Sequence, residues 1–313
     1  MTELTRQKGN ATLVAVWPGM GQVALNAGFY LMTRLQMREL PPVPAADLFD
    51  VEHVDVKDGL VAKTPPALGR LFLWNNPKDG RDIAVFLGES QPPPGRGAAC
   101  CGRLLDAVAP LGVRDVYTFA SMATDMLPSS PSRVVGIATD AEGLAELKGH
   151  DVSVLDSGRI SGLNGVFLAA AAERGLRGIG LLGEIPAFAA QIPYPKASRT
   201  VLETFSALSG IEVDVAELVR YEKGVDRQLT GLVSQIQSAI ESQAEKGEEE
   251  EEPEFQAEAE PALSDADRAR IENLFKRAHE DHANSFELKQ ELDRLGVFKD
   301  YEDRFLDLFR KAG

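Results

Sequence analysis

Short apolar runs alternate with helix-like segments from residue 11 to about residue 210, and this alternation limits the possible folds more than any other feature of the chain. Several of the runs are apolar at almost every position, which is typical of strands covered on both faces in a parallel sheet. The predicted strands cover residues 12–17, 71–74, 82–88, 115–120, 133–139, 152–156 and 178–183.

Helix-like segments separated by glycine-containing turns lie between these runs. Strands that alternate with helices predict an α/β layer fold. The stretch 49–74 differs, because alternating residues flank Asp58-Gly59, a strong turn dipeptide. It predicts a short hairpin that adds to the main sheet in antiparallel orientation. The predicted helices cover residues 20–37, 97–109, 141–147, 162–174 and 196–209.

The C-terminal part of the chain has a different character. Apolar residues recur at helical spacing between residues 214 and 243, which predicts one long amphipathic helix. The glutamate-rich segment that follows has the composition of a disordered linker. Ser264 and Asp267 have the spacing of a helix start, and further helical segments follow. We expect an α/β domain over residues 1–243, an acidic linker over 244–262 and a helical tail over 263–313.

The charge of the chain argues against nucleic acid as a partner. It carries 33 Lys and Arg against 48 Asp and Glu, a formal net charge of −15, whereas binding of a phosphate backbone needs a basic patch. Nine glutamates and one lysine fall between residues 245 and 260, so more than half of the excess lies in the linker. The N-terminus has no apolar signal segment, and no run of 18 apolar residues occurs. We therefore expect a cytoplasmic protein with no membrane contact.

Motifs for catalysis or metal binding are absent from the sequence. It contains no nucleophile elbow, Walker loop or kinase signature. Only His279 and His282 lie close together among the four histidines, and no carboxylate or cysteine completes a metal-ligand set with them. Cys100 and Cys101 are adjacent, which favours small buried thiols over a disulfide. We expect no catalytic residue, no metal and no cofactor, which favours a protein that is not an enzyme.

Residues 12–30, which read TLVAVWPGMGQVALNAGFY, raise the question of nucleotide binding. Gly19, Gly21 and Ala24 have G-x-G-x-x-A spacing between a predicted strand and a predicted helix, the context of a phosphate-binding loop. A dinucleotide fold also needs an acidic residue at the end of its second strand. Glu39 has about that spacing, but it lies in a segment rich in proline and alanine. We favour the interpretation that the glycines permit a tight turn and close helix packing.

Two acidic residues, Glu89 and Glu184, come directly after predicted strands. Ligands of open α/β sheets bind at the edge formed by the carboxyl ends of the strands, where Ser121, Met122 and Asn164 are also expected. Paired carboxylates there could act as acid and base; alternatively, they cap helices or hold glycine-rich loops together. The candidate ligand-binding residues are Gly19, Met20, Gly21, Asn26, Glu89, Asn164 and Glu184.

Five segments carry a family resemblance through their order along the chain. They read VWPGMGQVALNAGFYLM, LGESQP, FASMATDMLPSSPSRVVGIATD, SGRISGLNGVFLAAAAERGLRGIGLLGEIP and PYPKASRTVLETFSALSGIEVDVAELV. No single motif is decisive, but the succession W-P-G-M-G, G-E-x-Q, G-x-I-x-G-x-N-G and G-E-I-P is specific. Over about residues 10–240 the chain resembles the proteasome assembly chaperone family, in its archaeal and bacterial branch.

The resemblance implies a three-layer α/β/α sandwich with a mostly parallel sheet, similar in architecture to nucleoside phosphorylases, and no established catalytic site. Family members self-associate into dimers or small rings. The better understood ones are ATP-independent chaperones that hold α-type proteasome subunits, and they dock through a C-terminal tail with a tyrosine in the second-last position. This chain ends at residues 309–313 with FRKAG, and Tyr301 lies inside a predicted helix. Docking of that kind is therefore not expected.

Two classes of function remain open at this point. The first is a non-catalytic assembly chaperone or scaffold that self-associates, as a trimer or larger, and contacts an unidentified protein partner. The second is a protein or enzyme that binds a small molecule of the nucleoside or phosphate type at the sheet edge. A third interpretation gives the acidic linker and tail a solubilising role alone. In the first class, the tail residues that would contact the partner are Phe298, Tyr301, Phe305 and Phe309.

Overall fold

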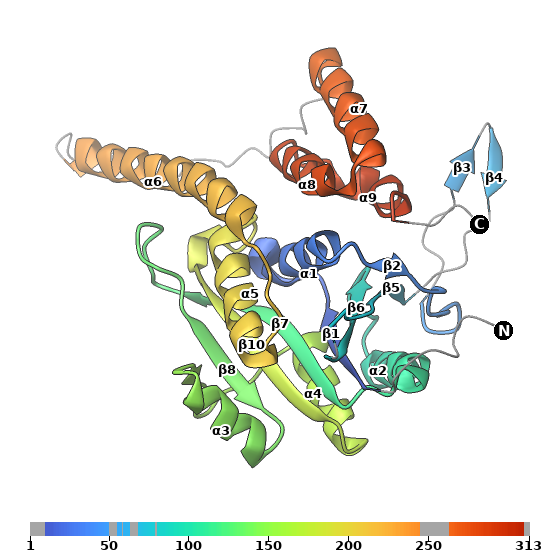
Figure 1. Cartoon of the computed structure of the whole chain (residues 1–313). Helices are drawn as coiled ribbons and strands as arrows, with labels where there is room; N and C mark the ends of the chain where they lie inside the picture. The colour runs from blue at the N-terminus through green and yellow to red at the C-terminus, as the bar shows by residue number, and fades with distance from the viewer. Residues whose placement is uncertain are drawn as a thin grey trace.

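The computed structural model describes residues 10–49, 55–57, 59–62, 68–78, 80–244 and 263–309. An eight-stranded sheet forms its centre, with the order β2-β5-β6-β1-β7-β10-β8-β9 (Figure 1). The central strands β6, β1, β7 and β10 are parallel to one another, whereas β5 and β8 join them in antiparallel orientation, so the sheet is mixed. The strands are β1 (Ala11–Val16), β2 (Arg38–Glu39), β5 (Gly69–Trp74), β6 (Asp82–Gly88), β7 (Asp115–Thr124), β8 (Val134–Ala138), β9 (Ser153–Val154) and β10 (Arg177–Pro186).

Helices cover both faces of this sheet and give the molecule three layers. The pleat of β1 shows how the sequence builds them, because successive side chains point to opposite faces. Val14 and Val16 belong to one core, and Leu13 and Ala15 to the other. The first core includes α1 (Val23–Arg34) and α5 (Pro195–Ser209), the second α2 (Gly97–Val108) and α4 (Leu163–Glu173), while α3 (Ala141–Gly149) packs beside β8 and β9.

The predicted strands and helices of the α/β region are confirmed, with two strands longer than expected. β7 and β10 pair over ten residues each, from Asp115 opposite Arg177 to Thr124 opposite Pro186. The sequence predicted ends at residues 120 and 183, because the serine, the glutamate and the proline beyond them look like loop residues. Pairing between the two strands keeps these residues extended, so the central ladder reaches beyond the end of β1.

The predicted hairpin is present, but its placement in the main sheet is wrong. β3 (Asp55–Lys57) pairs with β4 (Leu60–Ala62) as a separate two-stranded sheet. Leu60 and Val61 are 73% and 65% exposed, so these apolar side chains do not pack on the main sheet. The antiparallel addition next to β6 comes from β5 instead.

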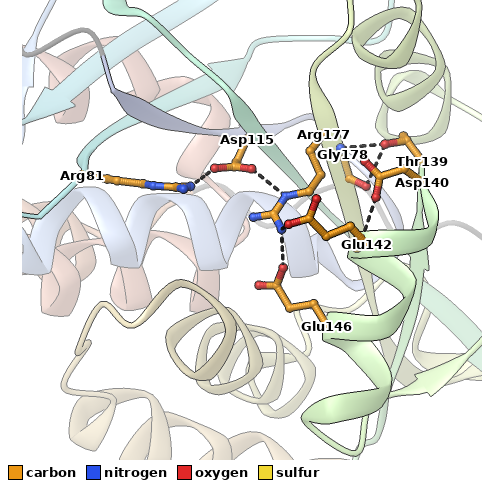
Figure 2. A network of polar contacts seen from close by, with 9 residues as sticks. Arg81, Asp115, Thr139, Asp140, Glu142, Glu146, Arg177 and Gly178 are labelled. Carbon is orange, nitrogen blue, oxygen red and sulfur yellow. Dashed lines mark hydrogen bonds and ion pairs between the residues drawn. The ribbon is translucent and has the colours of Figure 1, made fainter.

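Charged side chains connect the amino ends of the central strands (Figure 2). Asp115, buried at the start of β7, accepts a hydrogen bond from Nε of Arg177 on β10 at 2.7 Å and forms an ion pair with Arg81, just before β6. Arg177 also donates to Glu146 of α3 at 2.6 Å. Since a buried carboxylate is stabilised by paired guanidinium groups, this network fixes three strands and a helix at the edge opposite the candidate site.

The C-terminal helices form a small unit that packs on α1. The predicted long helix is α6 (Ala216–Ala244), and the predicted linker lies outside the described residues apart from Ala244, which ends α6. The chain continues in α7 (Asp265–Glu280), α8 (Ser285–Arg294) and α9 (Phe298–Asp307), which lie together above α1 in Figure 1. Ser264 caps α7 as predicted, because its Oγ accepts the N–H of Asp267 at 3.1 Å.

Aromatic rings pack this unit against α1. Phe286 of α8 meets the ring of Tyr30 edge-on, with centroids 4.5 Å apart. Phe298 and Phe305 of α9 meet the ring of Phe29 in the same way, at 5.2 and 5.8 Å. Edge-to-face pairs add about 0.5–1.5 kcal/mol each beyond the burial of apolar area. The tail is therefore part of the folded core.

A buried ion pair lies in the middle of this aromatic contact. Lys289 of α8 is 2% exposed, and its Nζ bonds to Asp293 at 2.8 Å and to Oδ1 of Asn26 on α1 at 2.9 Å. The same ammonium group lies 4.0 Å from the centroid of the Phe298 ring. These contacts offset the free-energy cost of removing the charged ammonium group from water.

Candidate functional site

The turn after β1 is a tight connection between a strand and a helix. Gly21 has a φ of 62°, a left-handed conformation that glycine adopts with the least strain. Its N–H donates to the carbonyl oxygen of Ala190 at 2.6 Å, and its own carbonyl accepts the N–H of Tyr194 at 2.8 Å. Gly19 has a φ of −164°, which any residue can adopt. Gly21 thus holds the segment after β10 against the start of α1.

Gln91 connects three segments at the carboxyl edge of the sheet. Its Nε2 donates to the carbonyl oxygen of Pro18 at 3.0 Å, and its Oε1 accepts the N–H of Leu163 at 3.1 Å. One side chain thereby joins the turn after β1, the loop after β6 and the first residue of α4. No prediction from the sequence assigned this role to Gln91, although its position in the G-E-x-Q segment directly after a strand was the available signal.

A hollow of about 540 Å³ lies beside the N-terminus of α4, and we call it the α4 hollow. The turn after β1, the end of β7 and the loop before α4 form its walls. Gly19, Met20 and Asn164, three of the candidate ligand-binding residues, line it together with Gln91. The other lining residues are Pro18, Ala24, Ala120, Ser121, Met122, Ala123, Leu155, Gly158, Arg159, Ile160, Ser161, Gly162 and Leu182.

A second hollow, of about 400 Å³, lies between the sheet edge and the C-terminal helices. Pro18, Gly19 and Glu89 line its domain side, and Phe298 and Glu302 are among the tail residues that close it. Burial raises the pKa of Glu89, and the nearby carboxylates of Glu302 and Asp303 raise it further. Glu89 is thus placed where the tail contacts the domain.

The two acidic candidates do not form a carboxylate pair. Glu89 follows β6 and Glu184 lies on β10, with β1 and β7 between them, which separates their strands by roughly 14 Å. Glu184 accepts hydrogen bonds from Nε and Nη2 of Arg133 at 2.7 and 2.9 Å. These bonds hold its pKa below the ordinary value. Glu184 therefore ties the segment before β8 to β10, and acid–base chemistry shared with Glu89 is ruled out by distance.

Of the remaining candidates, Gly21, Asn26, Tyr301, Phe305 and Phe309 line neither hollow. Gly21 shapes the turn, and Asn26 bonds Lys289 of the tail. Phe305 and Phe309 of the tail are 0% and 4% exposed. Phe298 and Tyr301 are half-buried and pack against the same core. In this arrangement the four tail aromatics contact their own chain, and Phe305 and Phe309 are too deeply buried to meet a partner.

The two cysteines have the properties of unreactive thiols. Both are buried, and burial raises the pKa of Cys100 as well as that of Cys101, the latter to about 11. A thiol that keeps its proton at neutral pH is a poor nucleophile. Within the described ranges, no three His, Cys, Asp or Glu side chains are grouped so that they could hold a metal ion. None of the described helices combines the length and the apolar character that a bilayer span requires.

A mixed sheet with a parallel centre, helices on both faces and connecting loops gathered at the carboxyl edge defines an α/β/α layer protein. The sequence model of the PAC2 family matches residues 13–233. The chain belongs to the PAC2 family, which confirms the resemblance seen in the ordered segments. The match ends within α6, so α7, α8 and α9 lie outside it.

Similar proteins come from archaea and bacteria. The uncharacterized protein MJ1210 of Methanocaldococcus jannaschii is 27% identical over 223 residues, which is 70% of this chain and 81% of that one. The crystal structure of Pyrococcus furiosus PbaB, described as an archaeal proteasome activator, is 24% identical with a TM-score of 0.61 and covers 71% of this chain and 93% of its own. The Mycobacterium tuberculosis proteasome-assembly chaperone homologue Rv2125 is 22% identical with a TM-score of 0.61, over 70% and 94%. At these identities the two structures show the fold.

Proposed function

We propose that this protein is a non-catalytic assembly chaperone or scaffold of the cytoplasm, which acts through self-association and contacts with other proteins. Membership of the PAC2 family supports a chaperone-like role. Two proteins of similar structure are described as a proteasome activator and a proteasome-assembly chaperone homologue, which makes proteasome subunits the first partner to test.

Exposed apolar side chains at the carboxyl edge of the sheet are the observation that carries this proposal. Met20, Leu127 and Phe188 are 42%, 57% and 51% exposed. They follow the ends of β1, β7 and β10, which are neighbours in the sheet. Large apolar groups that gather on a surface mark contact sites for other proteins. We call these three residues the apolar edge.

Hydrogen bonds hold the segments of the apolar edge in place. The carbonyl oxygen of Met20 accepts a bond from Oγ of Ser121 at 2.8 Å. The carbonyl of Pro128, next to Leu127, accepts a bond from Nζ of Lys196, which is 4% exposed. A contact surface that is fixed before binding loses less conformational entropy when a partner arrives.

Sedimentation velocity of the full chain tests self-association through this edge. We expect the parent protein to sediment as an oligomer and the Leu127→Ser/Phe188→Ser double variant to sediment as a smaller species. Leu60→Ser/Val61→Ser in the hairpin is the matched control, because it removes two apolar groups elsewhere that are more exposed than Leu127 and Phe188. An oligomer that resists the edge substitutions, or a monomeric parent protein, would contradict the proposal.

Binding of purified α-type proteasome subunits tests the proteasome link. Leu127 and Phe188 are exposed, so we expect the contact to depend on the apolar edge and to be weakened by Leu127→Ser/Phe188→Ser. Fluorescence anisotropy with labelled subunits measures the affinity. Absence of binding by the parent protein would assign the scaffold to another partner.

A further inference from the structure

Acidic side chains of the domain and of the tail face each other at the second hollow, the one of about 400 Å³. Glu89 follows β6 and Glu302 belongs to α9, and both line the hollow. Asp303, also on α9, lies close enough to Glu89 for the two charges to interact. We call these three residues the carboxylate cluster. Like charges that meet at a contact weaken it, so the contact of α9 with the domain contains a repulsion beside its aromatic packing.

The lysine in this hollow compensates the carboxylate cluster only in part. Lys299 is the one basic side chain among the described residues that line the hollow, and it is 73% exposed. Its Nζ lies 2.6 Å from Oε2 of Glu302, whereas its bond to Glu89, at 3.4 Å, goes to the backbone carbonyl oxygen. An ion pair with such an exposed partner is strongly screened by water.

The other charged groups nearby are already paired. Arg70 on β5 is buried, and its guanidinium group donates to both carboxylate oxygens of Glu39, at 2.8 and 3.0 Å. It also lies 3.5 Å from Oδ1 of Asp307 on α9. Asp293 lines the hollow as well, and its partner is Lys289. The carboxylate cluster therefore keeps an excess of negative charge.

The pKa of Glu89 agrees with this geometry. Burial raises the pKa, Glu302 and Asp303 raise it further, and the opposing effects of Lys299 and Arg70 are smaller. A carboxyl group with a raised pKa in the folded protein stabilises the fold while it carries its proton. This stabilisation is complete below the ordinary pKa of 4.5 and is lost as the pH rises through the folded-state pKa.

The helix on which the carboxylate cluster acts covers part of α1. Phe298 and Phe305 of α9 pack edge-on against Phe29, and the Phe298 ring also contacts the ammonium group of Lys289. Opening of α9 removes this cover from Phe29 and one contact from Lys289. A change of charge in the cluster thereby affects the apolar face of α1.

We propose that the carboxylate cluster is a proton-sensitive latch, which holds α9 on the domain more firmly when one of its carboxyl groups is protonated than when all three are ionised. The open state exposes Phe29 and the face of α1 around it. The latch involves neither Leu127 nor Phe188 of the apolar edge, so the two proposals are tested independently.

Hydrogen exchange of the full chain, followed by mass spectrometry, measures the opening of α9. Glu89→Gln replaces the carboxylate by a neutral amide of similar size and represents the protonated latch. At pH 7 we expect the amides of α9 to exchange about three- to tenfold more slowly in this variant than in the parent protein, because one pKa unit is a tenfold change in an equilibrium constant. Below pH 4.5 the two proteins should exchange alike, since Glu89 of the parent is then protonated as well. Equal or faster exchange in the variant at pH 7 would overturn the proposal.

A variant of the tail shows whether Glu89 acts through α9. In a chain with Glu302→Gln and Asp303→Asn, the slowing caused by Glu89→Gln should be at least about twofold smaller than in the parent chain, because the repulsion is already removed. Glu280→Gln is the control, since it removes the same charge from an exposed position at the end of α7. An undiminished effect of Glu89→Gln would assign it to burial alone, and equal slowing in the control would assign it to net charge; either result contradicts the latch.

The opposite change should open the latch. Lys299→Gln removes the exposed basic side chain of the hollow, and we expect the amides of α9 to exchange about two- to threefold faster at pH 7. Adding Glu89→Gln should reverse this increase. A loss of packing at Lys299 would not be repaired by a substitution on the domain, so faster exchange that persists in the double variant would contradict control by charge.

Discussion

Two glycines at the carboxyl edge of the sheet have different roles, which their spacing in the sequence does not distinguish. Gly19 and Gly21 look equivalent in a G-x-G pattern. The backbone distinguishes them, because Gly21 has a left-handed φ of 62° and Gly19 an extended one of −164°. An alanine side chain at Gly19 would meet nothing within 4 Å. One glycine is required by the turn, and the other is not.

Gly21→Ala should destabilise the protein by about 1 kcal/mol, because an L-residue in the left-handed region is strained. Gly19→Ala should leave the free energy of unfolding within about 0.5 kcal/mol of the parent value. Urea unfolding followed by circular dichroism measures both. Equal effects of the two substitutions would show that φ does not decide the role of these glycines.

Glu184 should make the stability of the protein depend on pH. Arg133 holds the pKa of Glu184 below its ordinary value of 4.5, so the unfolded chain binds the proton more readily. The stabilising contribution is complete above pH 4.5 and is lost as the pH falls through the folded-state pKa.

Glu184→Gln should therefore cost about 1 kcal/mol at pH 7, a modest value because the Arg133 side chain is 74% exposed. The difference from the parent protein should shrink below pH 4.5. Urea unfolding across this range measures it, with the exposed Glu212→Gln as control. A difference that stays constant down to low pH would assign the effect to packing and not to charge.

At the scale of elements, α8 is held on α1 by a buried charge as well as by aromatic rings. The side chains of Lys289 and Asp293 are each 2% exposed. Removal of one partner leaves the other charged and buried. Replacement of both by apolar groups removes both charges, although Oδ1 of Asn26 then loses its donor.

Lys289→Met and Asp293→Leu should each destabilise the full chain by about 3–5 kcal/mol, and the double variant Lys289→Met/Asp293→Leu should cost less than either alone. Chemical denaturation of the parent, the single variants and the double variant forms the thermodynamic cycle. Additive effects would indicate that the two side chains do not interact in solution.

At the scale of the whole molecule, the tail covers apolar surface of the family domain. Phe29 and Tyr30 of α1 are 1% and 0% exposed, partly because Phe286, Phe298 and Phe305 pack on them. α7, α8 and α9 lie outside the family match, and they close one face of α1.

A chain truncated after Ala244 should keep its α/β fold and expose this face. We expect far-UV circular dichroism to report a folded domain, and the fluorescence of an apolar dye such as ANS to increase. Addition of the separate segment 263–313 should reverse the increase. Unchanged dye binding after truncation would mean that α1 does not depend on the tail for cover.

The sequence alone determined the strand and helix succession, the PAC2 resemblance, the turn at Gly21 and the capped start of α7 at Ser264. These features depend on periodicity, turn chemistry and capping, which act between residues that are close along the chain. None of these local patterns predicted the order of the strands in the sheet.

Only the tertiary structure decided which polar residues meet. Lys289 and Asn26 are 263 residues apart in the sequence and bond at 2.9 Å, whereas Glu89 and Glu184 look like a pair and are separated by two strands. The separation of the hairpin from the main sheet and the burial of the tail aromatics were also decided by tertiary contacts. Burial and side-chain pairing depend on which surfaces come together across the whole fold. Patterns between residues close along the chain do not predict those long-range contacts.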